Sequence, residues 1–200
     1  MSALIRLNDK RAIPAIIRAL KDKDAPVRTL AVCALANLND PSTLGPLMKV
    51  LDDPSPDVVQ SLGVAIGALK DKSAVPRLLV ALTQENGRLV DPILRREAAH
   101  ALGMIGDEKA IPFLVKSLKD PNHVVRKAAV TALYNLHAHS AMDALLETLN
   151  DPEWTVRIEA MMAFMVLKDK TALKPLHDAL KREKHETVKR YIEDAIKELK

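Results

Sequence analysis

The stretch DEKAIPFLVKSLKDPNHVVRKAA, residues 107–129, contains the pattern that decides the fold of this 200-residue chain. Its first half reads Asp-x-x-Ala-Ile-Pro-x-Leu-x-x-x-Leu, and its second half reads Asp-Pro-x-x-x-Val-Arg-x-x-Ala. Apolar residues recur at helical spacing in both halves, and a short polar turn separates them. Proline is tolerated in the first turn of a helix, where its missing N–H costs little. The stretch therefore predicts two antiparallel helices.

The pattern recurs along the chain with a period near 31 residues. One alanine position occurs at Ala34, Ala65, Ala101, Ala132, Ala163 and Ala195, with spacings of 31, 36, 31, 31 and 32 residues. Such a period indicates a solenoid, because one hairpin is too small to bury its own apolar face and must stack on its neighbours. The sequence predicts an all-α solenoid (superhelix) of about six antiparallel helix pairs.

We predict a single repeat array over residues 1–200, divided by polar residues such as those of Asn39-Asp40 and Gly106-Asp107. Asn and Gly suit the left-handed position after a helix, and Asp suits the N-cap of the next one. The predicted units are a half repeat over 1–8 and repeats over 9–39, 40–70, 71–106, 107–137, 138–168 and 169–200. Because the half repeat matches only the end of a second helix, the N-terminal face is expected to dock on a preceding repeat or another subunit.

Five extra residues lie in the third repeat, within 83–93. Asp91-Pro92 suit an N-cap and a first helical residue, so the excess predicts a longer turn and an intact helix. A surface insertion of this size is either simply tolerated or forms a binding loop.

Composition points to an intracellular protein. Lys and Arg number 30 against 26 Asp and Glu, a formal charge of +4, which is far from that of a nucleic-acid-binding tail. The single cysteine, Cys33, excludes an intramolecular disulfide and favours a reducing compartment. Because the sequence has no secretory signal and no apolar run of about 20 residues, we expect a soluble, cytoplasmic protein with no membrane partner.

The pattern at residues 107–129 resembles the HEAT-like repeats first noted in phycobilisome bilin lyases, and the resemblance covers essentially the whole chain. It implies that the second helix of each pair lines a concave surface. It also implies a ladder in which an Arg position and an Asp position of the preceding turn bond along the stack. The Arg position holds Arg28, Arg95, Arg126, Arg157 and Lys189, with Val59 as the exception, and the Asp position holds Asp22, Asp53, Asp120 and Asp151. We expect a structural role for this ladder, with an anion-binding stripe as the alternative.

A group of apolar side chains on the fifth repeat is the best candidate for a binding site. On each second helix, positions equivalent to 29, 32, 33 and 36 lie opposite the expected core. In the fifth repeat these positions hold Ile158, Met161, Met162 and Met165, with Tyr134 beside them and Trp154 near their edge. Methionine is adaptable and common at interaction surfaces, so we predict that these residues bind a partner. The alternative is that neighbouring second helices cover part of the group.

Arg96, Lys127 and His100 lie on the same predicted surface. Their charge favours an acidic protein or peptide as the partner. Nucleic acid is an unlikely partner, because the basic residues are sparse and stacking aromatics are few. HEAT-like DNA glycosylases nevertheless bind DNA with a similar stack.

The sequence predicts no catalytic residue, cofactor or metal. His137, His139 and Asp143 are too few for a transition-metal site, which needs three or four convergent ligands. His185-Glu186 is similar to the His-Glu pairs of the HEAT-like dimetal hydroxylase that acts on lysine-derived hypusine, but that family has four such pairs and this chain has one. Cys33 has no base beside it to activate a nucleophile.

These observations predict a non-enzymatic protein–protein interaction scaffold that binds its partner on the concave surface. The family resemblance supplies one alternative, a bilin lyase or a lyase-like tetrapyrrole chaperone, and such lyases usually act as heterodimers. A nucleic-acid-binding solenoid is the second alternative.

Overall fold

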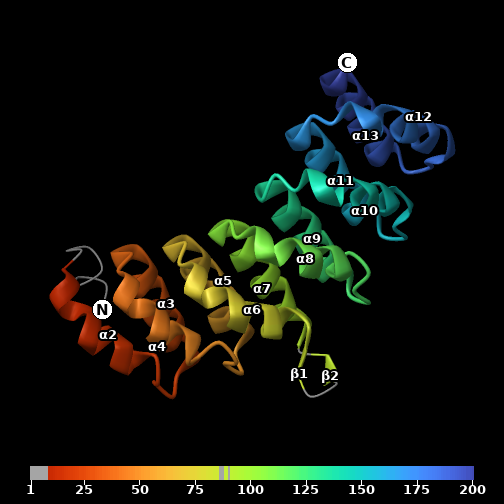
Figure 1. Ribbon diagram of the computed structural model, residues 1–200. Coiled ribbons are helices and arrows are strands. Elements are labelled where there is room, and N and C mark those ends of the chain that lie inside the picture. The colour runs from red at the N-terminus through yellow and green to blue at the C-terminus, as the bar shows by residue number, and fades with distance from the viewer. Residues whose placement is uncertain (1–8, 86–87, 90) are drawn as a thin grey trace. The chain divides into compact units, whose positions relative to one another are not determined.

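The computed structural model describes residues 9–85, 88–89 and 91–200 (Figure 1). The chain divides into two compact units, residues 1–107 and residues 108–200, which we describe separately. The predicted half repeat over 1–8 lies outside the described residues.

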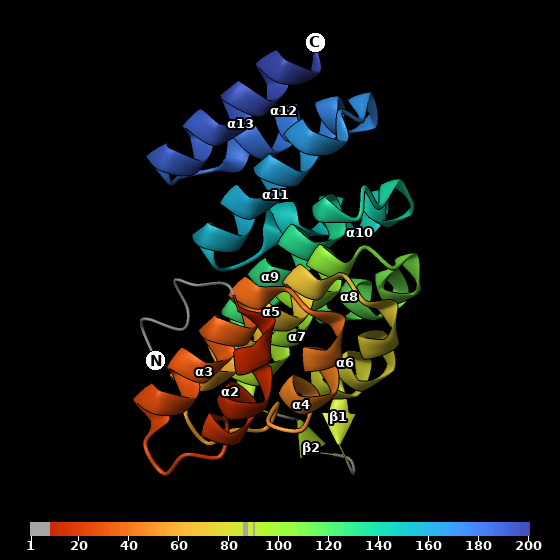
Figure 2. The ribbon, with the colours of Figure 1, turned by 90° about the vertical axis from the view of Figure 1, so that its left-hand side faces the viewer.

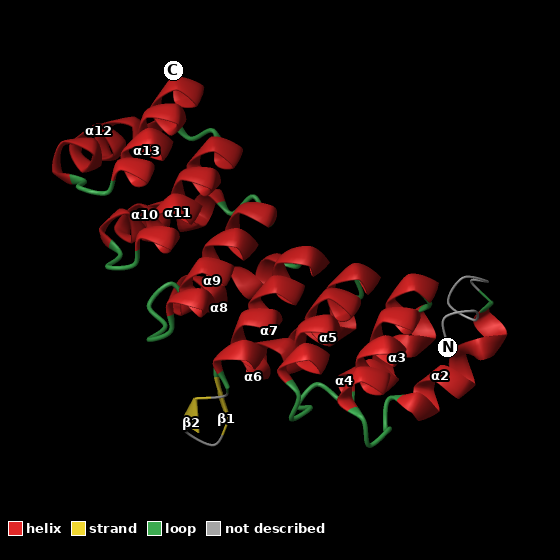
Figure 3. Cartoon of the chain, turned by 180° about the vertical axis from the view of Figure 1, so that it is seen from behind, coloured by secondary structure: helices red, strands yellow, loops and turns green. Residues whose placement is uncertain are grey.

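Unit 1 consists of three helical hairpins, and the second helices of consecutive hairpins pack side by side (Figure 3). The hairpins are α2 (Ile13–Ala19) with α3 (Ala25–Leu38), α4 (Leu44–Met48) with α5 (Pro56–Leu69), and α6 (Val75–Leu82) with α7 (Pro92–Ile105). Short 3-10 helices precede the first helix of each hairpin: η1 (Lys10–Ala12), η2 (Pro41–Thr43) and η3 (Lys72–Ala74).

The insertion in the third hairpin forms a small antiparallel ribbon of β1 (Gln84–Glu85) and β2 (Arg88–Leu89). Helix α7 then begins at Pro92, and the Asp91 side chain accepts a hydrogen bond from the Ile93 amide at 2.8 Å. The predicted N-cap and the intact helix after the insertion are both confirmed.

Unit 2 repeats this construction (Figure 2). Its hairpins are α8 (Ile111–Ser117) with α9 (His123–Asn135), α10 (Met142–Glu147) with α11 (Trp154–Leu167), and α12 (Leu173–Arg182) with α13 (Glu186–Leu199). Its 3-10 helices are η4 (Glu108–Ala110), η5 (His139–Ala141), η6 (Thr148–Asn150) and η7 (Lys170–Ala172). Helix α11 packs against both α9 and α13. The predicted all-α solenoid of paired helices is confirmed.

The repeated alanine position lies in the core of both units. Its six residues are at most 1% exposed: Ala34, Ala65, Ala101, Ala132, Ala163 and Ala195. Alanine has no side chain beyond Cβ, so a helix can approach its neighbour closely at this position. The period of the sequence therefore reflects the packing of each second helix in the stack.

The helices end and begin at the polar residues that the sequence predicted. Asn39 ends α3 with φ 43°, and Gly106 ends α7 with φ 79°, both in the left-handed region. Asp40 then accepts a hydrogen bond from the Ser42 amide at 3.0 Å, as expected of an N-cap. Asp9 does the same for the Arg11 amide at 2.9 Å. These contacts fix where the first two hairpins begin.

The predicted arginine ladder is structural and bridges consecutive hairpins. Arg28 donates from Nε and Nη2 to the Asp53 carboxylate at 2.7 and 2.8 Å. Its Nη1 donates to the backbone carbonyls of Asp22 at 2.8 Å and Lys23 at 3.2 Å. Arg28 therefore contacts Asp22, six residues earlier, through the backbone carbonyl of Asp22. The carboxylate that it binds, Asp53, belongs to the next hairpin. We call this set of four bonds a rung.

Unit 2 contains two further rungs of the same geometry. Arg126 binds the Asp151 carboxylate at 2.7 Å through both nitrogens, and Arg157 binds Glu183 at 2.8 and 3.1 Å. In each case Nη1 donates to two carbonyls, those of Asp120 and Pro121 for Arg126, and those of Asp151 and Pro152 for Arg157. Bidentate arginine–carboxylate pairs are among the stronger hydrogen-bonded contacts in proteins.

Acid is expected to destabilise the protein through two of the N-cap aspartates. The side-chain hydrogen bond from Arg11 lowers the pKa of Asp9 from 3.8 to about 2, and the hydrogen bonds from Ser42 and Lys10 lower the pKa of Asp40 to about 2. Because the pKa is lower in the folded state, this stabilisation is present above about pH 4 and is lost as the pH falls towards about 2. Urea unfolding from pH 5 to pH 2 measures the loss. The Asp9→Asn and Asp40→Asn double variant keeps its caps, and its free energy of unfolding should fall less steeply as the pH is lowered. An equally steep fall would contradict the role of these two carboxylates.

Among the described residues, no helix combines the length and the apolar composition needed to cross a bilayer.

Candidate functional site on the second helices

The structure divides the predicted methionine group into exposed and buried members. Met162 is 39% exposed, and Met165 and Ile158 are half-buried on the same helix, α11. Met161 is 0% exposed, so its predicted availability to a partner is wrong. The apolar surface that remains is smaller than the sequence suggested.

Burial of Met161 follows from how second helices pack. The equivalent positions on the other second helices are buried too: Val32, Gly63, Ala99 and Val130. Each lies on a second helix that packs against another second helix of its own unit: α3 against α5, α5 against α7, and α9 against α11. The position is therefore part of the helix–helix packing.

Tyr134 belongs to a polar cluster centred on the Glu159 carboxylate. Glu159 Oε1 accepts hydrogen bonds from Thr131 Oγ1 at 2.6 Å and from the Tyr134 hydroxyl at 3.3 Å. Lys127 Nζ lies 3.6 Å from Glu159 Oε2. Burial, and then the charge of Glu159, raise the pKa of Tyr134, so its hydroxyl stays protonated and can donate. The cluster joins α9 to α11.

Carboxylates also pair the predicted basic residues. Arg96 Nε donates to Glu97 Oε1 at 2.7 Å, and His100 Nδ1 lies 3.8 Å from Glu97 Oε2. Lys127 is paired with Glu159, as described above. Because Arg96 and Lys127 each have a carboxylate beside them, the attraction expected for an acidic partner is reduced.

Trp154 lies at the N-terminal end of α11 and is 40% exposed. Its ring stacks on His185, with 4.6 Å between the ring centroids and 11° between the planes. The tryptophan therefore covers the turn between α12 and α13 and is only partly available to a partner.

Sequence reasoning did not select the groove between α3 and α5 in unit 1. This groove has a volume of about 440 Å³, with Cys33 exposed and Val64 45% exposed. The residues that line it are Thr29, Cys33, Ala36, Asn37, Asp57, Gln60, Ser61 and Val64. Several of them occupy the repeat positions expected to face outward, but none is a large apolar side chain, so composition gave no signal.

The groove has the chemistry of a site for an extended polypeptide. Thr29, Asn37, Gln60 and Ser61 offer hydrogen bonds, while Val64 offers exposed apolar surface. Asp57 is the only charged residue of the lining. Together these groups favour a neutral or basic segment.

The described residues do not provide a metal centre. No group of three or more His, Cys, Asp or Glu side chains converges within the part of the chain that the structure describes. The His185 ring lies against Trp154, and Glu186 pairs with Lys189 at 2.8 Å. The histidine of the single His-Glu pair therefore packs on α11, and its glutamate is paired within α13.

Paired helices stacked at a regular period, with exposed surface on the second helices, define an α-helical repeat protein. Models of the HEAT repeats family match residues 1–65, 46–134 and 115–197. The chain therefore belongs to the HEAT-repeat family.

Curated relatives include deoxyhypusine hydroxylase of Gallus gallus, which is 32% identical over 111 residues. That match covers 54% of this chain and 36% of the relative, so the chain spans little more than a third of the length of this protein. The human enzyme is 30% identical over 114 residues, with 56% and 37% of the two chains covered. The predictions of a non-enzymatic scaffold and of no enzymatic role are wrong by these comparisons, because these relatives are enzymes.

Solved structures support the fold. The complex of CpcE and CpcF of phycocyanin lyase from Nostoc sp. PCC7120 aligns with a TM-score of 0.57 and 23% identity, covering 98% of this chain and 85% of that chain. At this identity the likeness supports the repeat architecture only, and it does not carry the lyase alternative. A designed armadillo repeat protein in complex with the peptide (KR)4 aligns with a TM-score of 0.60 and 21% identity, covering 94% and 99%. Repeat proteins of this architecture thus bind peptides or partner subunits.

The metal centre implied by the dimetal hydroxylase does not fit the residues described here. That centre uses four His-Glu pairs, whereas this chain has one, and its histidine and glutamate have other partners. No chemical step is therefore assigned to a metal bound by these repeats.

Proposed function

We propose that this chain forms the polypeptide-binding repeats of a cytoplasmic protein-modifying enzyme related to deoxyhypusine hydroxylase. The groove between α3 and α5 would hold a segment of the protein substrate. The observation that carries this proposal is the composition of the groove, whose exposed hydrogen-bonding groups surround a single carboxylate, Asp57.

Charge supports a basic substrate segment more than the acidic partner expected from the sequence. Arg96 and Lys127 are paired with Glu97 and Glu159, whereas Asp57 lines the groove with no cation beside it in the lining. The relatives act on deoxyhypusine, a lysine-derived residue, and a related designed repeat protein binds (KR)4. A cationic side chain therefore suits this groove.

Unit 2 would add an apolar contact of its own. Met162, Met165 and Ile158 present adaptable apolar surface on α11, the helix whose Glu159 accepts a hydrogen bond from the Tyr134 hydroxyl of α9. Burying such surface against a partner contributes roughly 25 cal/mol per Å². Replacement of Met162 by Glu tests this contact separately from the groove.

The only cysteine provides a direct test, because Cys33 lines the groove and is exposed. A peptide with a central deoxyhypusine residue is expected to slow alkylation of Cys33 at least fivefold at saturation. A peptide with lysine should protect less, and one with acetyl-lysine least. Alkylation followed by mass spectrometry measures the rate.

Two variants in unit 1 serve as a matched pair for this test. Val64→Lys places a cation in the groove and should abolish protection by the basic peptide. Val80→Lys adds the same charge on α6, where Val80 is 41% exposed and outside the lining, and should leave protection intact. An alkylation rate that does not change with the deoxyhypusine peptide would refute the proposed function.

A further inference from the structure

Position 59 breaks the ladder of rungs. Arg28, Arg126 and Arg157 each occupy the same position of a second helix and bind a carboxylate of the next hairpin and two carbonyls of their own turn. In α5 this position is Val59. The two carbonyls that correspond to the acceptors of Arg28 are those of Asp53 and Pro54. Among the described side chains, none is placed to donate to them as an arginine at 59 would.

The acidic partner of this rung is also missing from the sequence. Asp53 lies 25 residues after Arg28. With the five-residue insertion, the corresponding position after Val59 is residue 89, which is leucine. Both positions of this rung therefore hold apolar residues in place of a charged pair.

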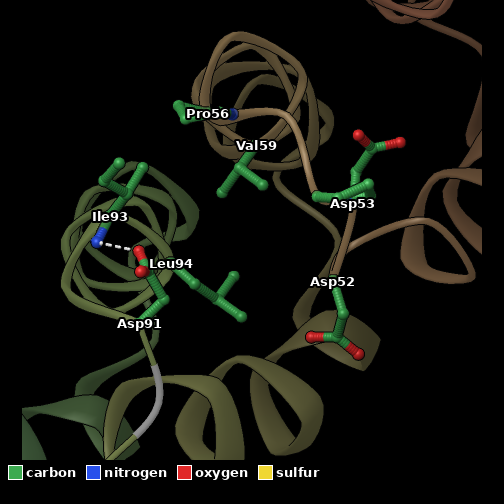
Figure 4. A pocket seen from close by; sticks show the side chains of 8 residues that line it. Asp52, Asp53, Pro56, Val59, Asp91, Ile93 and Leu94 are labelled. Carbon is green, nitrogen blue, oxygen red and sulfur yellow. Dashed lines mark hydrogen bonds between the residues drawn. The ribbon is translucent and has the colours of Figure 1, made fainter. Parts of the chain in front are cut away.

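A pocket of about 360 Å³ lies where the missing arginine would be. Figure 4 shows Val59 of α5 and Leu94 of α7 pointing into it, with Asp52 and Asp91 around it. Pro54 also belongs to the lining. The pocket lies within unit 1 and shares no lining residue with the α3–α5 groove.

Three carboxylates line the pocket, and two of them are paired with arginines. Asp53 is bound by Arg28 at 2.7 Å, and Asp52 pairs with Arg77 at the surface. Asp91 uses one oxygen to cap α7 and is exposed. Burial acts to raise the pKa of Asp53, but hydrogen bonds from Arg28 and the Ser55 amide outweigh it, so the pKa is lowered and the group is charged at neutral pH. Three carboxylates thus lie near two arginines.

We propose that this pocket binds the guanidinium group of an arginine side chain from a polypeptide partner. The incoming group would take the place that Arg28, Arg126 and Arg157 fill in the other hairpins. It would donate to the carbonyls of Asp53 and Pro54 and to Asp91, while its apolar stem would lie against Val59 and Leu94. A planar guanidinium with five donors suits this arrangement of acceptors better than an ammonium group.

Short peptides test the proposal with the whole chain. Acetyl-Gly-Arg-Gly-amide is expected to bind at least tenfold more tightly than its citrulline twin, which has the same shape without the charge, and more tightly than its lysine twin. Calorimetric titration measures the three dissociation constants. Equal affinity for the arginine and citrulline peptides would overturn the proposal.

Variants show whether binding occurs in this pocket. Val59→Arg supplies an internal guanidinium to the same carbonyls, so it should weaken binding of the arginine peptide at least tenfold. Val80→Arg adds the same charge outside the pocket and should leave the affinity unchanged. If Val59→Arg binds the peptide as tightly as the unmodified chain, the proposal fails.

A second variant keeps the test decisive if Val59→Arg does not fold. Asp91→Asn removes the charge while asparagine still caps α7, so the fold should persist and the affinity should fall about fivefold. An unchanged affinity would overturn the proposal. Because the groove and the pocket share no lining residue, alkylation of Cys33 should respond to neither variant, and the two proposals can fail independently.

Discussion

Replacing Arg126 by alanine is expected to lower the free energy of unfolding by about 3 kcal/mol. The Arg126 side chain is 12% exposed and that of its partner Asp151 is 6% exposed. Removal of the guanidinium leaves a buried carboxylate with no cation and two backbone carbonyls with no donor. Breaking one partner of such a pair costs more than the pair contributes, because the remaining charge stays out of water. Urea unfolding monitored by circular dichroism measures the change.

The same unit contains an exposed ion pair that serves as a control. Lys119 and Glu147 lie 3.1 Å apart, and their side chains are 76% and 64% exposed. Exposed pairs of this kind contribute at most about 1 kcal/mol, so Lys119→Ala should have a small effect. Equal losses for the Arg126 and Lys119 variants would show that burial does not determine the strength of the rung.

Replacing Gly63 by leucine is expected to destabilise unit 1 by about 3 kcal/mol. A Cβ atom at Gly63 would lie 2.8 Å from the Cβ atom and 2.6 Å from Oε2 of Glu97 on α7. The first of these contacts is with the stem of the side chain, which cannot move away without displacing the helix. A larger side chain would therefore push α5 and α7 apart. Chemical denaturation monitored by circular dichroism measures the loss.

Gly45 on α4 provides the matched control. A Cβ atom there would meet nothing within 4 Å, and the residue is exposed. Gly45→Leu should leave stability unchanged or raise it by up to about 1 kcal/mol, because glycine is unfavourable inside a helix. Similar effects at the two positions would contradict the close approach of α5 and α7.

The fold could be predicted from the sequence because its core repeats at the period of the chain. The alanine of each second helix is buried, and Asn39 and Asp40 end one hairpin and begin the next as predicted. These features depend on contacts within a hairpin or with an identical neighbour. The local sequence pattern and the tertiary packing therefore indicate the same helix boundaries and the same core positions.

The exposed surface was harder to predict, because a helix in a stack has two flanks as well as a core side. Met161 lies on a flank and is buried, while Met162, one residue further, is exposed. Successive side chains on a helix are rotated by about 100°, so a small error in the assumed rotation of the helix changes a buried position into an exposed one. The groove at Cys33 and Val64 is formed by the spacing of α3 and α5, which composition does not report.

The enzymatic relationship was missed for a different reason. Periodicity reports the residues that recur, whereas residues that perform chemistry need occur only once. Val59 shows the same limit, since its significance appears only when the geometry of the intact rungs is known.

Each intact rung makes the folding of one hairpin depend on the next. The arginine of one second helix fixes its own turn through two carbonyls and holds a carboxylate that the following hairpin provides. If one hairpin melts, its neighbour is left with an unneutralised buried charge, so the two tend to melt together. At Val59 this rung is absent, and the second and third hairpins are joined by apolar packing and by the surface ion pair of Asp52 with Arg77. The electrostatic coupling between neighbouring hairpins is therefore uneven along unit 1.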